Sequence, residues 1–255
     1  MDISSSTIGE LLEGILYGDG THGKLERLAT TARYETGESV YRHNDPAEHW
    51  FRILAGAARK STLSGDGYRH IVDFLLPGDF FGFCATPGRD FCVEAIVPGT
   101  VIARYARGSA ERLADRDPQV AQLIRQIAFA SIARLQRRVI ILGRSSALEK
   151  VSTFLLEMAD RSPAGATQPV YLPMSRNDIA DYLAMAAETL CRTLTALRAR
   201  RAISFQDARW VRICDRAALE RVSDRLSRRF PYNPGLSTTY GPNAPPLSSP
   251  ALPGI

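Results

Sequence analysis

Residues 175–213 read SRNDIADYLAMAAETLCRTLTALRARRAISFQDARWVRI. Ser175, followed three positions later by Asp178, is typical of a helix N-cap with an acidic first turn. Residues 184–186 separate this short helix from a second one, which we expect to begin near Ala187 because an apolar stripe starts there. The stripe consists of Leu190, Leu194 and Leu197. Two short helices joined by a tight turn predict a helix-turn-helix.

A basic hairpin is predicted directly after the second helix. Ile203–Phe205 and Arg209–Ile213 are short strand-like runs, separated by the turn residues 206–208. In a helix-turn-helix the second helix enters the major groove of DNA. The hairpin would then form a wing beside the phosphate backbone. The polar side chains that we expect to meet that backbone are Ser175, Arg176, Thr189, Thr195, Arg209 and Arg212.

Glu188 and Arg192 are the candidates for reading bases from the second helix. They are four residues apart, so they project side by side. Arg192 can donate two parallel hydrogen bonds to O6 and N7 of guanine, and Glu188 can accept one from the amino group of cytosine. The alternative is an ordinary surface ion pair between successive helical turns. Their neighbours Ala187 and Cys191 complete the predicted base-reading set.

The net charge of the chain is concentrated in this region. Residues 175–229 hold 12 Arg, no Lys and 7 Asp or Glu, which gives +5. The whole chain of 255 residues, with 32 basic and 27 acidic residues, also carries +5, so the remainder balances to zero. A basic block on a neutral body favours a polyanionic partner for that block. The alternative is an arginine-rich composition without such a partner.

Residues 34–105 have a different pattern, in which short apolar runs alternate with turn signals at regular intervals. This pattern predicts a small antiparallel barrel or jelly roll. Within it, the turn residues Ser64–Gly67 lie between Arg59–Leu63 and Tyr68–Leu75. We therefore expect a hairpin at this position.

A long helix is predicted from Pro118, with Asp117 as its N-cap. No Pro or Gly interrupts residues 119–142. The apolar residues fall near positions a and d of a heptad, the pattern of a helix that pairs with a copy of itself. The candidate interface residues are Val120, Leu123, Ile124, Ile127, Ser131, Leu135 and Leu142. The alternative is a core helix that packs only on the barrel.

The sequence argues against several classes of protein. It has no apolar run of about 18 residues, so no transmembrane helix is expected. Residues 1–6 lack the basic start and apolar stretch of a signal peptide. The four cysteines show no CxxC spacing, which argues against a zinc site or a disulfide scaffold. No GxSxG motif or P-loop is present, so we expect no enzyme. A cytoplasmic chain with reduced thiols is the expectation.

The motifs of residues 30–220, in their order and spacing, resemble the Crp–Fnr superfamily of bacterial transcription regulators. The matching pieces are Gly37–Val40, Asp45, Leu54–Gly56, Asp66–Arg69, Pro77–Gly82 and Ala187–Arg192. The resemblance implies an α+β fold, with a cyclic-nucleotide-binding-type β-roll (jelly roll), a long dimerisation helix and a C-terminal winged helix-turn-helix. The expected domains are residues 1–116, 117–143 and 144–229. A proline-rich tail, residues 230–255, is expected to be disordered.

Within this family, Ala187 before Glu188 resembles the Fnr and FixK branches, whose half-site is of the TTGA type. The implied DNA site is a palindrome resembling TTGA-N6-TCAA. A homodimer would bind its two half-sites about one helical turn apart. The resemblance to the FixK-like branch further implies a transcription activator that works with RNA polymerase.

The β-roll lacks the residues with which nucleotide-binding relatives hold a ligand, namely a Glu after the Gly and an Arg-Ser pair. Phe83 follows Gly82, and Arg89 is followed by Asp90, whose carboxylate would repel a phosphate. No cysteine precedes Cys84, so the iron–sulfur ligand set of Fnr sensors is missing. We therefore expect no cofactor. The alternative function is a regulatory module that binds a cyclic nucleotide or haem and gates a partner protein. Haem ligands would then come from His43, His49 and His70.

Cys191 stands where the family more often has Ser or Gly, directly before Arg192. Oxidation of its thiol to a sulfenic or sulfinic acid would add bulk and negative charge against the phosphates. Cys191 is therefore a candidate redox brake on DNA binding. The alternative is a small residue that contacts a thymine methyl group.

Overall fold

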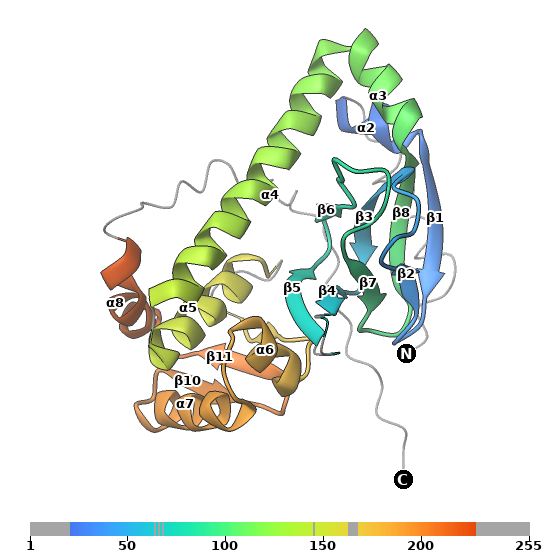
Figure 1. The fold of residues 1–255 in the computed structure, drawn as a ribbon. Coiled ribbons are helices and arrows are strands. Elements are labelled where there is room, and N and C mark those ends of the chain that lie inside the picture. The colour runs from blue at the N-terminus through green and yellow to red at the C-terminus, as the bar shows by residue number, and fades with distance from the viewer. Residues whose placement is uncertain are drawn as a thin grey trace, which may run out of the picture. The chain divides into compact units, whose positions relative to one another are not determined.

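The structure, a computed structural model, describes residues 21–63, 65, 67, 69–144, 146–162 and 168–227. It divides into two compact units. Among the described residues, unit 1 comprises residues 21–58 and Leu75–Phe129, and unit 2 comprises Arg59–Phe74 and the residues from Ala130 onward. Figure 1 shows the elements along the chain. Residues 1–20 and the tail 230–255 lie outside the described residues.

Strands β1 to β8 form the roll that the sequence predicts. One sheet has the order β1-β8-β3-β6 and the other the order β2-β7-β4-β5. The pairs β1–β8, β8–β3, β3–β6 and β2–β7 are antiparallel. The strands are β1 (Ala29–Tyr34), β2 (Ser39–Tyr41), β3 (His49–Ala55), β4 (Ala58–Leu63), β5 (Arg69–Leu75), β6 (Phe80–Phe81), β7 (Cys92–Ala95) and β8 (Thr100–Ala106). The predicted hairpin corresponds to β4 and β5, which are neighbours in their sheet.

The core of unit 1 joins the first sheet to the helices that precede and follow the roll in the chain. Helix α2 (Thr21–Glu26) is fixed by Glu26, whose carboxylate accepts hydrogen bonds from Arg52 at 2.5 Å and from Tyr105 at 2.6 Å. Helix α3 (Arg107–Arg116) follows β8 directly. The buried cluster consists of Leu25, Trp50, Leu54, Phe80, Ala103, Tyr105, Ala110, Leu123 and Ile127.

Helix α4 (Pro118–Arg144) is the predicted long helix. Asp117 precedes it and accepts a hydrogen bond from the backbone N–H of Gln119 at 2.9 Å. The predicted dimer interface needs a correction, because Val120, Leu123 and Ile127 are at most 6% exposed and lie in the core of unit 1. Ile124 packs against the same core. An apolar helical stripe does not itself specify whether its own domain or a partner covers it.

Different apolar side chains of α4 are exposed. Phe129 is 64% exposed, Ile132 48%, Leu135 41% and Val139 68%. The spacing of three, three and four residues keeps them on one broad face of a helix. Of the predicted interface residues, Leu135 belongs to this exposed face, while Ser131 and Leu142 are half-buried.

Unit 2 contains the predicted winged helix-turn-helix. Helix α5 (Ala147–Asp160) and helix α6 (Arg176–Tyr182) both begin with capping boxes, at Ser146 and Ser175. Helix α7 (Ala187–Ala199) follows a turn in which Ala184 has a φ of +48°, and Leu190, Leu194 and Leu197 are buried as predicted. A sheet of order β10-β11-β9 and helix α8 complete the unit. Their bounds are β9 (Val170–Tyr171), β10 (Ile203–Phe205), β11 (Trp210–Ile213) and α8 (Arg216–Ser227).

The hairpin strands β4 and β5 contribute to the core of unit 2. Phe74, the last residue of β5 inside this unit, is 1% exposed. Its ring centroid lies 5.0 Å from that of Tyr182 in α6 and 6.5 Å from that of Phe154 in α5. Residues 59–74 are therefore packed into the same body as the helix-turn-helix.

Candidate nucleic-acid interface

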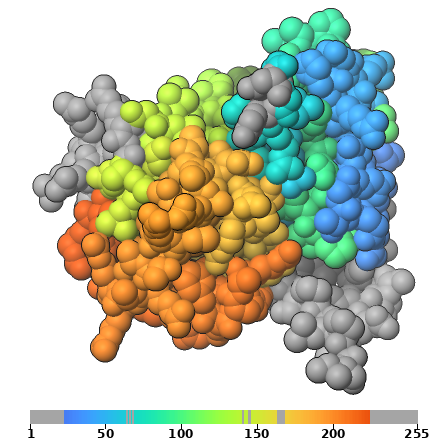
Figure 2. Space-filling view, turned by 60° about the horizontal axis from the view of Figure 1, so that its bottom comes forward, coloured from blue at the N-terminus to red at the C-terminus, as the bar shows by residue number. Residues whose placement is uncertain are grey.

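Helix α7 has one buried face and one polar face. While its leucines anchor it in unit 2, Glu188, Thr189, Cys191, Arg192 and Thr195 are exposed and Ala187 is half-buried. Figure 2 looks onto this side of the molecule, where the orange atoms of α7 and the wing form part of the surface. All the residues that we predict to read bases thus lie on one short helix, with at least part of each accessible.

Glu188 and Arg192 form an ion pair across one turn of α7. The Nη2 atom of Arg192 lies 2.5 Å from Oε1 of Glu188, and the two side chains are 78% and 73% exposed. Exposed pairs of this spacing contribute only about 0.3–0.5 kcal/mol to stability. The surface ion pair that the sequence left as an alternative is therefore present without DNA, but little free energy opposes its exchange for contacts to bases.

The start of α7 leaves backbone N–H groups available. Its N-cap, Ala186, has no side-chain hydrogen bond to them. The first N–H groups of an α-helix have no partner within the helix, and they favour an anion such as phosphate. Thr189 is exposed in this first turn, while the hydroxyl of Thr195 donates a hydrogen bond to the Cys191 carbonyl at 2.9 Å.

The wing presents two arginines. Its turn is closed by Asp207, which accepts hydrogen bonds from the backbone N–H groups of Arg209 at 2.6 Å and Trp210 at 2.9 Å. The Arg209 guanidinium donates to the hydroxyl of Tyr171 at 3.2 Å. Arg212 is exposed on β11. Both side chains are therefore accessible on the hairpin that the sequence assigns to the phosphate backbone.

Arg176 contacts the wing as well as the solvent. Its Nη2 donates to the carbonyl of Ala208 at 2.9 Å, and its guanidinium lies 5.2 Å from the ring centroid of Phe205. Burial lowers the pKa of Arg176, while the nearby Cys191 thiol acts in the opposite direction. From the sequence we predicted only a contact with the DNA backbone for Arg176. Its contact with the wing spans 32 residues, for which no local sequence signal exists.

In the roll, Arg89 is directed inward. It is 2% exposed and donates to the carbonyls of Gly82 and His49, both at 2.5 Å. Its guanidinium lies 4.4 Å from the ring centroid of Tyr41. Gly82 has a φ of +87°, and a Cβ there would lie 2.9 Å from Nη1 of Arg89. Arg89, which we compared with the phosphate-binding arginine of nucleotide-binding relatives, therefore binds backbone carbonyls of the roll itself.

Two family models match the chain. A cyclic nucleotide-binding domain matches residues 31–117, and a Crp-like helix-turn-helix domain matches residues 149–222. The nitrogen fixation regulation protein FixK of Bradyrhizobium diazoefficiens is 37% identical over 71% of this chain and 77% of its own length. The transcriptional activatory protein AadR of Rhodopseudomonas palustris is 35% identical over 73% of this chain and 78% of its own.

The chain belongs to the Crp–Fnr family of transcription regulators, in its FixK-like branch. Its fold agrees with the structure of FixK2 from Bradyrhizobium japonicum, with a TM-score of 0.72 and 36% identity over 76% of this chain and 96% of the other. These findings confirm the predicted family, fold and DNA-binding regulatory function. In this Crp–Fnr regulator, α6 and α7 lie inside the helix-turn-helix match.

Two features are absent from the described residues. No helix in that part of the Crp–Fnr regulator is long and apolar enough to cross a membrane. Nor does the same part contain a group of three or more His, Cys, Asp or Glu side chains that could hold a metal ion.

Proposed function

We propose that the protein binds a palindrome resembling TTGA-N6-TCAA as a homodimer and activates transcription with RNA polymerase in the cytoplasm. The observation that carries this proposal is the exposed Glu188–Arg192 pair on α7, the second helix of the helix-turn-helix. A carboxylate facing DNA is unfavourable unless it accepts from a base. The presence of Glu188 therefore favours sequence readout over general attraction to phosphates.

Each base-reading residue has a distinct role in this proposal. Arg192 donates to O6 and N7 of the guanine in TTGA, and Glu188 accepts from the amino group of a cytosine. Ala187 and Cys191 are small, so they allow close approach of α7 and contact thymine methyl groups. The ion pair separates on binding, and both charged groups gain DNA partners in its place.

Three elements of the winged helix-turn-helix contact the phosphate backbone in this proposal. Ser175 and Arg176 lie at the start of α6, Thr189 and Thr195 on α7, and Arg209 and Arg212 on the wing. Arg176 contributes through the donors that its contacts with Ala208 and Phe205 leave unused. Such contacts set orientation and affinity but carry no direct sequence information.

Binding of fluorescent duplexes measures the proposed readout. We expect the purified protein to bind the palindrome at nanomolar concentrations and to bind a duplex with both TTGA elements scrambled at least about 1,000-fold more weakly. Equal affinity for the two duplexes would contradict sequence-specific readout of this site.

We propose that the homodimer forms through the exposed apolar face of α4. Phe129, Ile132, Leu135 and Val139 are the large apolar side chains on this face. Leu135→Glu combined with Val139→Glu should convert the dimer to monomers in sedimentation experiments, because it buries charge between the helices. Gln126→Glu, at an exposed position of the same helix on the side opposite Leu135 and Val139, is the matched control and should leave the dimer intact. A dimer that survives the double substitution would rule out this face.

We also propose that Cys191 is a redox brake on DNA binding. Its side chain is exposed on the polar face of α7, beside Arg192 and near Arg176. Peroxide should weaken binding of the wild type to the palindrome and leave Cys191→Ser unaffected. Equal weakening in both proteins would assign the effect of peroxide to another residue. Cys191 would then be only a small residue that contacts a base.

A further inference from the structure

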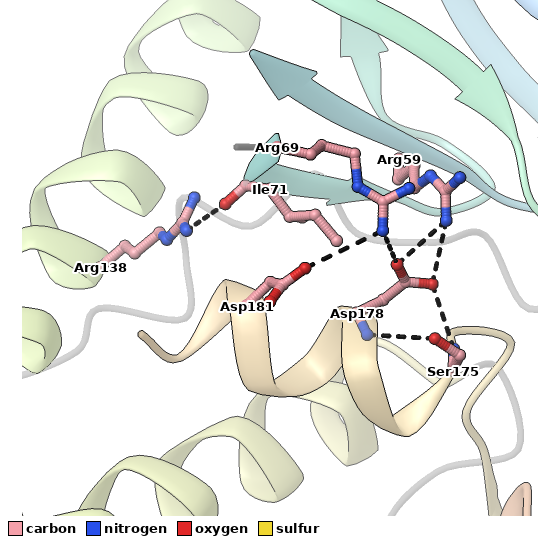
Figure 3. A network of polar contacts seen from close by, with 7 residues as sticks. All are labelled: Arg59, Arg69, Ile71, Arg138, Ser175, Asp178 and Asp181. Carbon is pink, nitrogen blue, oxygen red and sulfur yellow. Dashed lines mark hydrogen bonds and ion pairs between the residues drawn. The ribbon is translucent and has the colours of Figure 1, made fainter. Parts of the chain in front are cut away.

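Asp178 of α6 is a buried carboxylate whose ion-pair partners come from the roll's hairpin. Its side chain is 6% exposed. Arg59 of β4 donates through Nη1 to both oxygens, at 3.0 and 3.1 Å, and Arg69 of β5 donates through Nη2 to Oδ1 at 2.7 Å. Figure 3 shows both guanidinium groups converging on this carboxylate from one side. The residues that neutralise Asp178 are thus 119 and 109 positions away in sequence.

The same carboxylate closes the first turn of α6. The backbone N–H of Ser175 lies 3.4 Å from Oδ2 of Asp178, and the Asp178 N–H donates to the Ser175 hydroxyl at 3.0 Å. Ser175 is among the proposed phosphate contacts. A carboxylate without its arginines at this point would repel a phosphate at Ser175 and would lack compensation for its burial.

The start of α6 also connects to the wing. Arg176 lies between Ser175 and Asp178 and donates to Ala208 in the turn of the wing at 2.9 Å. The first turn of α6 therefore contacts the hairpin through Asp178 and the wing through Arg176. A displacement of this turn would move two of the three groups of proposed backbone contacts together.

The other end of α6 is tied to the same hairpin. Arg138 of α4 donates to the carbonyl of Ile71 in β5 and, at 3.0 Å, to the carbonyl of Tyr182, the last residue of α6. Its guanidinium lies 4.1 Å from the ring centroid of Tyr182. Phe74 of β5 also packs against Tyr182. Helix α6 is thus attached to residues 59–74 both at Asp178 in its first turn and at its last residue, Tyr182. Figure 3 shows the contacts of Asp178 and the bond from Arg138 to Ile71.

We propose that Arg59 and Arg69 are positioning residues for DNA recognition. They neutralise Asp178 and thereby hold the first turn of α6, with the wing attached to it, in the orientation that DNA binding requires. They lie outside the helix-turn-helix match, within the segment that matches the cyclic nucleotide-binding domain. A segment of the sensor-type domain therefore sets the geometry of the DNA-binding surface. The inference rests on the DNA contacts proposed above.

Equilibrium binding of the full chain to the labelled palindrome tests this proposal. We expect Arg59→Ala combined with Arg69→Ala to weaken binding by about tenfold, within the range of measured couplings in charge networks. Adding Asp178→Asn should restore most of the affinity, because it removes the uncompensated charge and keeps an oxygen for the cap. His70→Ala, at an exposed position beside Arg69, is the matched control and should bind like the wild type.

Three readouts separate positioning from other roles. Thermal melting establishes that each variant is folded at the temperature of the binding experiment. Arg69→Gln, at the more exposed arginine, is a milder second variant. Its loss of DNA affinity should also be restored by Asp178→Asn. The slope of log K against log salt should stay that of the wild type, whereas direct phosphate contacts would reduce it by about 0.9 each. Arg192→Ala reports separately on the proposed base readout.

The possible outcomes are distinct. Wild-type affinity in the folded double variant would overturn the proposal, and so would failure of Asp178→Asn to restore binding. A reduced salt slope would make the two arginines direct phosphate contacts instead. Loss of binding in the double variant, with Arg192→Ala unaffected, would contradict the proposed base readout and retain the positioning role.

Discussion

Two carboxylate–arginine contacts in the helix-turn-helix have opposite physical characters. On α7, Glu188 and Arg192 are 73% and 78% exposed and belong to one helix. On α6, Asp178 is 6% exposed, and its arginines, 16% and 35% exposed, come from a distant hairpin. The first pair is weak because water competes for both charges. The second cannot lose a partner without leaving a charge buried.

This difference separates the residues that contact DNA from those that shape the contact surface. An exposed pair can exchange its partner for a base at little cost, as specific readout requires. A buried, multiply bonded carboxylate fixes the relative position of the elements that it joins. Substitutions at the two places should therefore change different properties of the protein.

Removal of the buried contact should give the largest loss of stability. Arg59→Ala with Arg69→Ala leaves the Asp178 carboxylate buried without compensation, which costs about 3–5 kcal/mol. The urea midpoint, followed by circular dichroism, should fall accordingly. His70→Ala is the surface control, with an expected change within about 0.5 kcal/mol. If both variants unfolded at the same urea concentration, the Asp178 contact would be as weak as an exposed pair.

Removal of the exposed arginine should instead affect recognition. Arg192→Ala should cost about 1–3 kcal/mol of binding free energy for each half-site and relax the preference for guanine there. Its free energy of unfolding, measured by urea titration, should stay within about 0.5 kcal/mol of the wild-type value. Arg198→Ala, an exposed arginine near the other end of α7, is the matched control and should retain the guanine preference. Unchanged affinity in Arg192→Ala would show that another residue reads this base.

An arginine on the wing should affect affinity without affecting sequence preference. Arg212→Ala should weaken binding to the palindrome and to unrelated duplexes alike, and reduce the salt slope by about 0.9 for each phosphate that the protein no longer neutralises. Anisotropy titrations at several salt concentrations measure both quantities. Weakening confined to the palindrome would place Arg212 among the base-reading residues.

Neutralising the exposed carboxylate should have the smallest effect on stability. Glu188→Gln should change the free energy of unfolding by less than about 0.5 kcal/mol, since the pair is solvated. The base preference should nevertheless relax, because the glutamine amide can donate as well as accept hydrogen bonds. A large drop in stability would indicate that the pair is structural.

Elements whose signal in the sequence is local were predicted correctly. The capping box at Ser175, the turn before Ala187 and the leucine stripe of α7 each depend on residues a few positions apart. The alternation of strands and turns likewise predicted the roll. In these cases the residues that stabilise the element are the same residues whose spacing predicts it.

The errors concern partners that are distant in sequence. The heptad of α4 correctly predicted a long helix but not which apolar residues the chain's own core covers, so Val120, Leu123 and Ile127 were assigned to a partner. Asp178 was predicted as a capping residue, which it is, while its burial under Arg59 and Arg69 depends on how the hairpin packs. Charge patterning alone contains no information about such long-range pairs.

Selection of binding sites from a random duplex pool is the decisive experiment for recognition of DNA by α7. The wild-type protein should enrich two TTGA half-sites in inverted orientation with six base pairs between them, and Arg192→Ala should enrich the same arrangement with no preference at the guanine. Absence of an enriched palindrome, or the same guanine preference in both proteins, would contradict recognition of DNA by Glu188 and Arg192 of α7.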